Sequence, residues 1–239
     1  MIQDDSFVAV IPAAGQGKRF GTVKPKQYLE LEGRTILERS ISPLLQIKNC
    51  LGIAVMVNAK DNLWKELDLV NNEKVRFIEG GKSRIDSSIN GINFWLESEL
   101  HFSNILIHDA VRPCLKIFDL KNLLKHFTDL KNKNSAEGLI LAKRSTDTIK
   151  LTEEDGVIKR TLDRDILWSA LTPQIFSKEA LFKAAKFYNT SNDIYTDESS
   201  LVEQSGGLVR VLEGSATNIK ITVEEDLILA KSCITLMNQ

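Results

Sequence analysis

The chain has 239 residues, of which 43% are hydrophobic and 26% are charged, and its formal net charge is −1. This composition is that of an ordinary globular protein, and it offers no strongly basic or acidic field for binding nucleic acid or a membrane surface. The first residues lack the basic segment and apolar core of a secretory signal, and no apolar run approaches the roughly 20 residues of a membrane span. We therefore expect a cytoplasmic protein with neither nucleic acid nor membrane as a partner.

The first predicted strand, Phe7 to Ile11, runs into the glycine-rich loop Pro12 to Gly17. Small residues let such a backbone approach a ligand closely, and the cations that follow suit a polyphosphate. The loop lacks the Lys-Ser or Lys-Thr ending of a P-loop, because Arg19 follows Lys18. Phe20 stands where a dinucleotide fingerprint needs its third glycine. Glycine spacing alone fits a plain strand-to-helix turn equally well.

Strands and helices alternate along the rest of the chain. Apolar runs predict strands over 51–57, 75–78, 104–107, 138–142, 208–212 and 219–222, and helical periodicity predicts helices over 35–46, 61–70, 84–96, 120–130, 178–188, 197–204 and 223–236. This order predicts an α/β fold, a Rossmann-like and mainly parallel sheet with helices on both faces. We see no linker, so residues 1–239 are expected to form one domain.

Three polar or glycine-bearing clusters follow predicted strands, at Ala13–Gly17, Gly80–Ser87 and Asp109–Arg112. Open α/β sheets bind ligands at the carboxyl ends of their strands, so these clusters are expected to share one site. The Asp109 carboxylate suits Mg²⁺ or a ribose hydroxyl, or else an ion pair with Arg112. Gly80 and Gly81 suit backbone contact with a base edge, with a hydroxyl from Ser87, or else a simple turn.

Residues 146–162 predict a β-hairpin, with Asp155-Gly156 as its turn. A two-stranded ribbon is marginal alone in water and needs something to pack against. The hairpin can pack on its own domain, or it can serve as an arm that clasps a second subunit.

Taken together, these strings resemble the 2-C-methyl-D-erythritol 4-phosphate cytidylyltransferase family of the non-mevalonate isoprenoid pathway. The resemblance spans nearly the whole chain and rests on PAAGQGKRF, KPKQYL, TILERS, EGGKSRIDSS, HDAVRPC, STDTIK, LDRDILWSALTPQIF, TDESSLVE, LEGSATNIKIT and EEDLILA, in the family's order. It implies a Mg²⁺-dependent nucleotidyltransferase that joins the α-phosphate of CTP to the phosphate of methylerythritol phosphate and releases pyrophosphate.

The resemblance also implies roles for individual residues. Arg19, Lys26 and Lys220 are implied to be catalytic, binding the triphosphate and stabilising charge on the α-phosphorus. CTP is implied to lie against Ala13, Ala14, Gly15, Gly17, Gly80, Gly81, Ser87, Asp109 and Ala110, with Asp109 also at the metal. Methylerythritol phosphate is implied to contact Asp109, Arg112, Thr148, Arg164, Thr172 and Thr196. In this family the 146–162 arm crosses to the other subunit of a homodimer.

Two positions depart from the family's pattern. Lys82 stands where many relatives have an acidic residue, and Asp165 follows Arg164 where asparagine is more usual. The second change puts a negative charge beside a phosphate-binding arginine. Two alternatives stay open: a ribitol-5-phosphate cytidylyltransferase with the same chemistry, or a nucleotide-binding domain without catalysis. A Rossmann oxidoreductase is disfavoured by Phe20.

Overall fold

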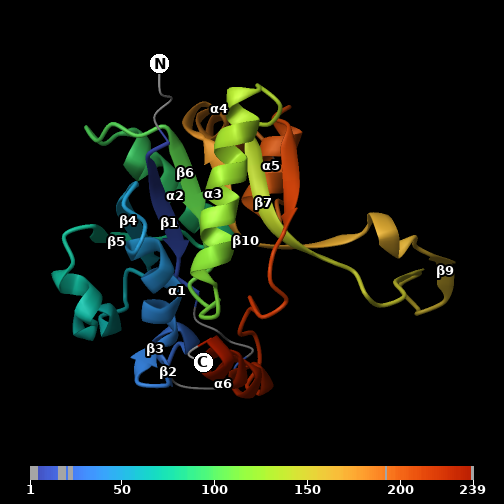
Figure 1. The fold of residues 1–239 in the computed structure, drawn as a ribbon, viewed down its shortest axis with the longest axis horizontal. Coiled ribbons are helices and arrows are strands. Elements are labelled where there is room, and N and C mark those ends of the chain that lie inside the picture. The colour runs from blue at the N-terminus through green and yellow to red at the C-terminus, as the bar shows by residue number, and fades with distance from the viewer. Residues whose placement is uncertain (1–4, 16–19, 21–23, 192, 238–239) are drawn as a thin grey trace.

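The computed structural model describes residues 5–15, 20, 24–191 and 193–237. Its centre is a seven-stranded sheet in the order β11-β7-β10-β6-β1-β4-β5 (Figure 1). The strands are β1 (Phe7–Pro12), β4 (Cys50–Val57), β5 (Val75–Glu79), β6 (Asn104–Ile107), β7 (Gly138–Arg144), β10 (Trp168–Ser177) and β11 (Val209–Glu213). All neighbouring pairs are parallel except those that β10 makes with β6 and β7. The predicted mainly parallel α/β fold is confirmed.

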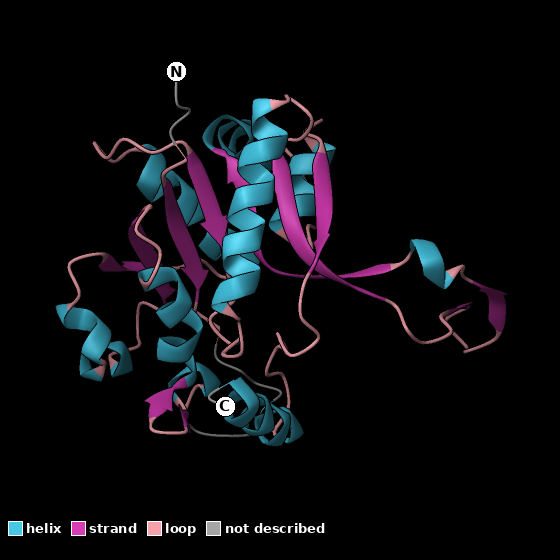
Figure 2. Cartoon of the chain, viewed as in Figure 1, coloured by secondary structure: helices cyan, strands magenta, loops and turns pink. Residues whose placement is uncertain are grey.

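Helices cover both faces of this sheet (Figure 2). One face packs on α1 (Ile36–Leu45) and α3 (Ile117–Asn132), and the other on α2 (Arg84–Leu96), α4 (Lys178–Tyr188) and α5 (Glu198–Gln204). The caps follow from the sequence: the side chains of Thr35 and Ser83 each close a capping box, and Ser177 accepts from the Ala180 amide. A parallel sheet buried on both faces explains the continuous apolar runs of its strands.

A third apolar cluster lies beyond the carboxyl ends of the central strands. It joins α6 (Glu225–Met237) to Ile36, Val111 and Ile221. The short strands β2 (Glu30–Leu31) and β3 (Arg34–Thr35) form a separate two-stranded sheet. Through this packing, segments from both ends of the chain lie near the carboxyl ends of the central strands.

Two predicted elements are wrong, and three strands, β2, β3 and β10, were not predicted. Residues 61–70 form no α-helix; they form the 3-10 helices η3 (Leu63–Glu66) and η4 (Asp68–Asn71). Residues 219–222 form no strand, because Ile221 donates its N–H to Val111 in a loop instead of joining a sheet. Strand β10 was missed, because polar residues and Pro173 interrupt its apolar residues and leave no continuous apolar run.

The hairpin extends away from the body of the protein (Figure 2). Strands β8 (Lys150–Thr152) and β9 (Ile158–Thr161) pair only with each other, and all their residues are exposed. The short 3-10 helix η5 (Arg164–Ile166) follows on the way back to β10. We call residues 146–162 the arm. Within one chain, the arm does not pack on its own sheet.

Candidate active site

A buried carboxylate, Asp109, lies just beyond the carboxyl end of β6. Its oxygens contact Arg84 Nε at 2.9 Å, Arg112 Nε at 3.0 Å and Lys220 Nζ at 3.0 Å. Burial favours the neutral acid and raises the pKa of Asp109, but the three cations outweigh burial and hold this pKa well below its usual range. Asp109 is therefore ionised at neutral pH, and the predicted ion pair with Arg112 is present.

The loop after β1 fits closely against the loop after β5. A Cβ at position 80 would lie 2.7 Å from the Cβ of Ala14, so the two loops approach this closely only because residue 80 is glycine. The buried Ser87 hydroxyl accepts from the Gly81 amide (3.0 Å) and donates to the Ser83 carbonyl (2.9 Å). Ser87 therefore sets the shape of the glycine turn.

A cavity of about 280 Å³ lies between the loop after β1 and Asp109, and Gly80, Gly81 and Ser87 are not among the described residues that line it. Its lining brings together residues from both ends of the chain, including Ala13, Ala14, Gly15, Lys26, Arg84, Asp109, Ala110 and Lys220. The Lys26 ammonium donates to the Ile221 carbonyl at 2.7 Å, next to Lys220 in sequence. Two of the three predicted catalytic cations thus face one cavity, as expected for a site that binds a polyphosphate.

A second cavity of about 240 Å³ shares Arg84, Asp109 and Lys220 with the first. It adds Arg112, Thr172 and Thr196, three of the residues predicted to bind the acceptor. Thr172 is fixed firmly, because its hydroxyl accepts the Asp109 N–H at 3.0 Å and its carbonyl accepts from the Asn218 side chain at 2.8 Å. The Asp109–Lys220 ion pair therefore forms a wall common to both cavities.

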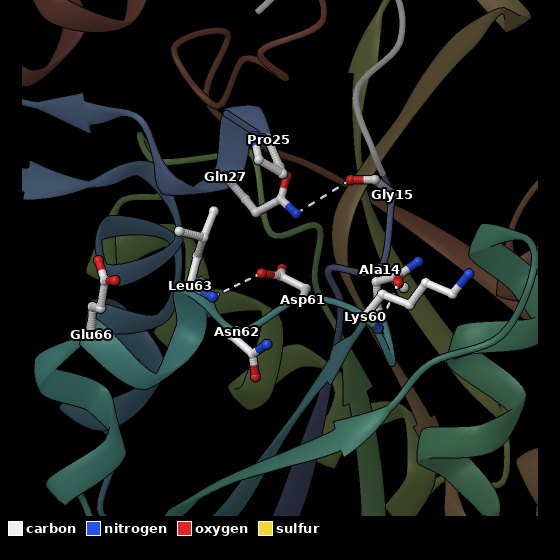
Figure 3. Close-up of a pocket in the computed structure, with 10 residues that line it drawn as sticks. Ala14, Gly15, Pro25, Gln27, Lys60, Asp61, Asn62, Leu63 and Glu66 are labelled. Atoms are coloured by element: carbon white, nitrogen blue, oxygen red, sulfur yellow. Dashed lines mark hydrogen bonds between the residues drawn. The ribbon is translucent and has the colours of Figure 1, made fainter. Parts of the chain in front are cut away.

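A third cavity, of about 420 Å³, also reaches Ala14 and Gly15 (Figure 3). Gln27 lies beside it and donates to the carbonyls of Ala13 (2.8 Å) and Gly15 (3.2 Å), as the dashed line in Figure 3 shows for Gly15. Asp61 and Lys60, from the loop after β4, also line this cavity (Figure 3). Gln27 thus supports the glycine loop from a position that the sequence did not reveal.

Some predicted site residues are not brought to Asp109. Thr148 and Arg164 lie in and beside the exposed arm, where the Arg164 guanidinium donates to the Thr146 carbonyl at 3.2 Å. Gly17 and Arg19 lie outside the described residues. The structure therefore leaves the predicted roles of these four residues as predictions.

Sequence reasoning did not foresee two features near Asp109: the pairing of Arg84 with Glu198, and the buried His108. Arg84 also binds Glu198, whose carboxylate is fully buried at the start of α5. His108 is buried next to Asp109 and shares a hydrogen bond with the Thr172 hydroxyl at 2.9 Å. Burial lowers the pKa of His108 to about 4. Both Arg84 and Glu198 stand in motifs quoted above, EGGKSRIDSS and TDESSLVE, but only the fold pairs them.

The donor set at Asp109 suits Mg²⁺ when phosphate oxygens complete its shell. Mg²⁺ commonly takes one or two carboxylates together with substrate phosphates and waters. Among the described residues, no three His, Cys, Asp or Glu side chains gather to hold a metal ion without substrate. Among the described residues that line the cavity under the glycine loop, Asp109 is the one carboxylate, so it is the residue that fits this metal.

Comparisons with known proteins agree over almost the whole chain. The family described as 2-C-methyl-D-erythritol 4-phosphate cytidylyltransferase (IspD) matches residues 7–236. A protein of that name from Wigglesworthia glossinidia brevipalpis is 39% identical, covering 95% of each chain. One from Aliivibrio fischeri is 37% identical, covering 98% of this chain and 96% of its own.

Solved structures of similar proteins have the same fold. A 4-diphosphocytidyl-2C-methyl-D-erythritol synthase superposes with a TM-score of 0.79 at 32% identity, covering 98% of this chain and all of its own. The Francisella tularensis 2-C-methyl-D-erythritol 4-phosphate cytidylyltransferase gives 0.78 at 31% identity, covering 95% of this chain and 99% of its own. The sheet with its inserted antiparallel strand is thus shared with proteins whose names describe cytidylyl transfer.

Proposed function

The chain belongs to the 2-C-methyl-D-erythritol 4-phosphate cytidylyltransferase family, and we propose that the two cavities around Asp109 hold its two substrates. The enzyme joins the α-phosphate of CTP to the phosphate of 2-C-methyl-D-erythritol 4-phosphate and releases pyrophosphate. One observation carries the assignment of the cavities. Lys220 and Asp109 line both of them, so two phosphates bound in the two cavities would meet at the Lys220 ammonium.

The cavity under the glycine loop is assigned to CTP. Its walls include the backbone at Ala13–Gly15, which offers groups to a base without intervening side chains, and Gly80, in the turn after β5, packs against Ala14. Lys26 and Lys220 would hold the triphosphate and, with Arg19, stabilise the charge that develops on the α-phosphorus. Phosphoryl transfer depends mainly on positioning and on charge stabilisation, which this inventory of cations supplies.

The adjoining cavity is assigned to methylerythritol phosphate. Arg112, Thr172 and Thr196 line it, together with the shared Asp109. The phosphate of the acceptor would lie toward Lys220 and Arg112, and the threonine hydroxyls would receive its hydroxyl groups. In this arrangement Lys220 orients the attacking oxygen and the α-phosphorus at the same time. The entropic cost of bringing the two reactants together is then met when the substrates bind, which lowers the barrier of the chemical step.

We also propose that Asp109 takes part in binding Mg²⁺ when CTP is present. The ion would neutralise part of the charge on the triphosphate. Lys220 is 37% exposed and can yield its contact with Asp109, whereas Arg84 and Arg112 keep the carboxylate in place.

The arm supports a homodimer whose acceptor sites use residues of both chains. Val157 and Ile158 are 60% and 57% exposed, and Ile166, just beyond the arm, is 75% exposed. Crossing to a second subunit would bury these side chains and carry Thr148 and Arg164 to the partner's acceptor cavity.

No helix of the described chain is long and apolar enough to cross a membrane. We propose a cytoplasmic location on the basis of the three reduced cysteines.

Pyrophosphate release tests the proposal. The purified protein is supplied with CTP and Mg²⁺, and with either methylerythritol phosphate or ribitol 5-phosphate. Release with methylerythritol phosphate alone is the expected result. Release with ribitol 5-phosphate alone would keep the chemistry and transfer the enzyme to the rival substrate. Binding of CTP by calorimetry without release in either case would favour the non-catalytic alternative.

A further inference from the structure

Arg84 connects two segments that serve different substrates. It is the first residue of α2, and its guanidinium contacts two carboxylates at once: Asp109 through Nε at 2.9 Å, and Glu198 through Nη1 at 2.9 and 3.1 Å. Arg84 lines both cavities around Asp109. A planar guanidinium presents several donors in a fixed arrangement, so it can bridge two acids in a way that an ammonium cannot.

Glu198 is not among the described residues that line the two cavities. Its side chain is fully buried, whereas the side chain of Arg84 is 28% exposed. A buried carboxylate is costly unless it is paired, and Arg84 is its only charged partner among the described residues. Burial lowers the pKa of Arg84, but the two carboxylates outweigh it and raise this pKa above its usual value, so the bridge stays charged. The pairing with Glu198 therefore fixes the position of the Arg84 guanidinium.

The segment that carries Glu198 also forms the acceptor cavity. Thr196 lies two residues before Glu198, and Asp197 between them caps α5 by accepting from the Ser200 amide at 3.0 Å. The side chain of Gln174, in β10, donates to Asp197 at 2.9 Å and accepts from the Ser199 amide at 3.1 Å. These hydrogen bonds fix the start of α5 to the sheet. Because Arg84 contacts both Glu198 of α5 and Asp109, it links the position of Asp109 to that of α5.

We infer that the Glu198–Arg84 pair is a positioning device for the reaction: it holds the Asp109 carboxylate in place and ties that position to the acceptor-binding start of α5. This inference rests on the proposed function. Arg112 and Lys220 hold one oxygen of Asp109, and Arg84 alone among the described residues holds the other. Without the bridge, Asp109 keeps its charge and burial but loses the contact that sets its rotation.

Arg84→Lys and Glu198→Gln test the inference. Lysine keeps the charge but lacks the two separate donor atoms, Nε and Nη1, with which Arg84 contacts Asp109 and Glu198, and glutamine keeps the shape of Glu198 without its charge. We expect each change to lower kcat and kcat/KM together, on the order of 10- to 100-fold, with the KM values for CTP and the acceptor within about threefold. A loss confined to the transition state has this signature, whereas lost substrate contacts raise KM.

The double variant and a control complete the experiment. If Glu198 acts through Arg84, the double variant loses little more activity than Arg84→Lys alone. Val202→Ala, on the buried side of the same helix, removes packing without touching the bridge and serves as the control for lost stability. We expect it to lower the melting temperature and leave kcat unchanged.

Three results would overturn the inference: wild-type kcat in folded Arg84→Lys, a raised KM as the only effect, or strict additivity of the two changes. A wild-type protein that is silent with CTP and either acceptor overturns the proposed function instead. Calorimetric titration of each variant with CTP then shows whether the nucleotide cavity stays intact, which the positioning role requires.

Discussion

The Asp109 site and the arm are built on opposite principles. At Asp109, one buried carboxylate has three charged partners within the same chain. In the arm, β8 and β9 pair only with each other, and apolar side chains such as Ile158 lie in water. The ion pairs of the first region lie within one chain, and the second region presents a surface that one chain leaves uncovered. Changes at the site should therefore act within a subunit, and changes in the arm should act between subunits.

The largest effect at the site should come from Lys220→Ala, which should lower turnover far more than stability. We expect kcat to fall by roughly 10²- to 10³-fold, about 2.7–4 kcal/mol in the transition state, because a preorganised cation at the reacting phosphates is lost. The free energy of unfolding should change by less than about 1 kcal/mol, since this side chain is partly exposed. Lys231→Ala, which breaks the surface pair with Glu32, is the control and should keep full turnover. Equal losses in both variants would remove Lys220 from the mechanism.

Substitutions at two glycines should affect stability differently at the site and in the arm. Gly80→Ala should cost about 1–3 kcal/mol and lower CTP affinity, because its Cβ meets Ala14 and Ser87 in a packed region. Gly156→Ala strains the arm's turn, where φ is +88°, by about 1 kcal/mol, yet a Cβ there meets open space. Chemical denaturation should show the loss in the first variant and leave the main transition of the second unchanged. A larger shift in the second variant would mean that the arm folds together with the body.

His108 should give the site a pH-dependent stability that the arm lacks. The folded pKa, about 4, lies below the ordinary value of 6.5, so the unfolded chain binds a proton first as pH falls. Stability is unaffected by this group above pH 6.5 and declines below it, by about 2 kcal/mol at pH 5. His108→Asn cannot bind that proton, so its unfolding free energy should vary less between pH 7 and pH 5. Parallel curves for the two proteins would refute this account.

The smallest effect is expected from the arm. Ile158→Asp should raise the dissociation constant of the proposed dimer at least tenfold, about 1.4 kcal/mol, because a charge would replace a buried apolar group. Sedimentation at several concentrations measures this constant. Ile228→Asp places the same change on exposed α6, at 71% exposure, and should leave the dimer unaffected. A dimer that tolerates Ile158→Asp would argue for a different interface.

Periodicity and caps were sufficient to predict much of the fold. The bounds of α2 and α4 agree with the prediction, because Ser83 and Ser177 cap helices whose apolar stripes are regular. Strand β10 was not predicted because Ser169, Thr172 and Gln174 separate its apolar residues and Pro173 interrupts it. The segment around Lys220 alternates like a strand, but it is a loop fixed by a bond from Ile221 to Val111.

The site was predictable where chemistry follows a strand directly, as at Asp109 and the glycine loops. The Arg84–Glu198 pair was not, because its members are 114 residues apart and nothing local in either motif identifies the other. Likewise, Ser87 carries the hydroxyl expected from its motif, but only the fold shows that this hydroxyl shapes the turn at Gly81.

Strand β10 also explains how a long arm could be added to this fold. Because β10 lies antiparallel beside β7, with Trp168 opposite Arg144 and the Arg144 guanidinium 4.3 Å from the Trp168 ring, the chain returns beside the place it left. Residues 145–167 are thus the loop of one large hairpin. The length of this loop can change without altering the path of the remaining chain, so the reach of the arm is separable from the fold that holds the Asp109 site.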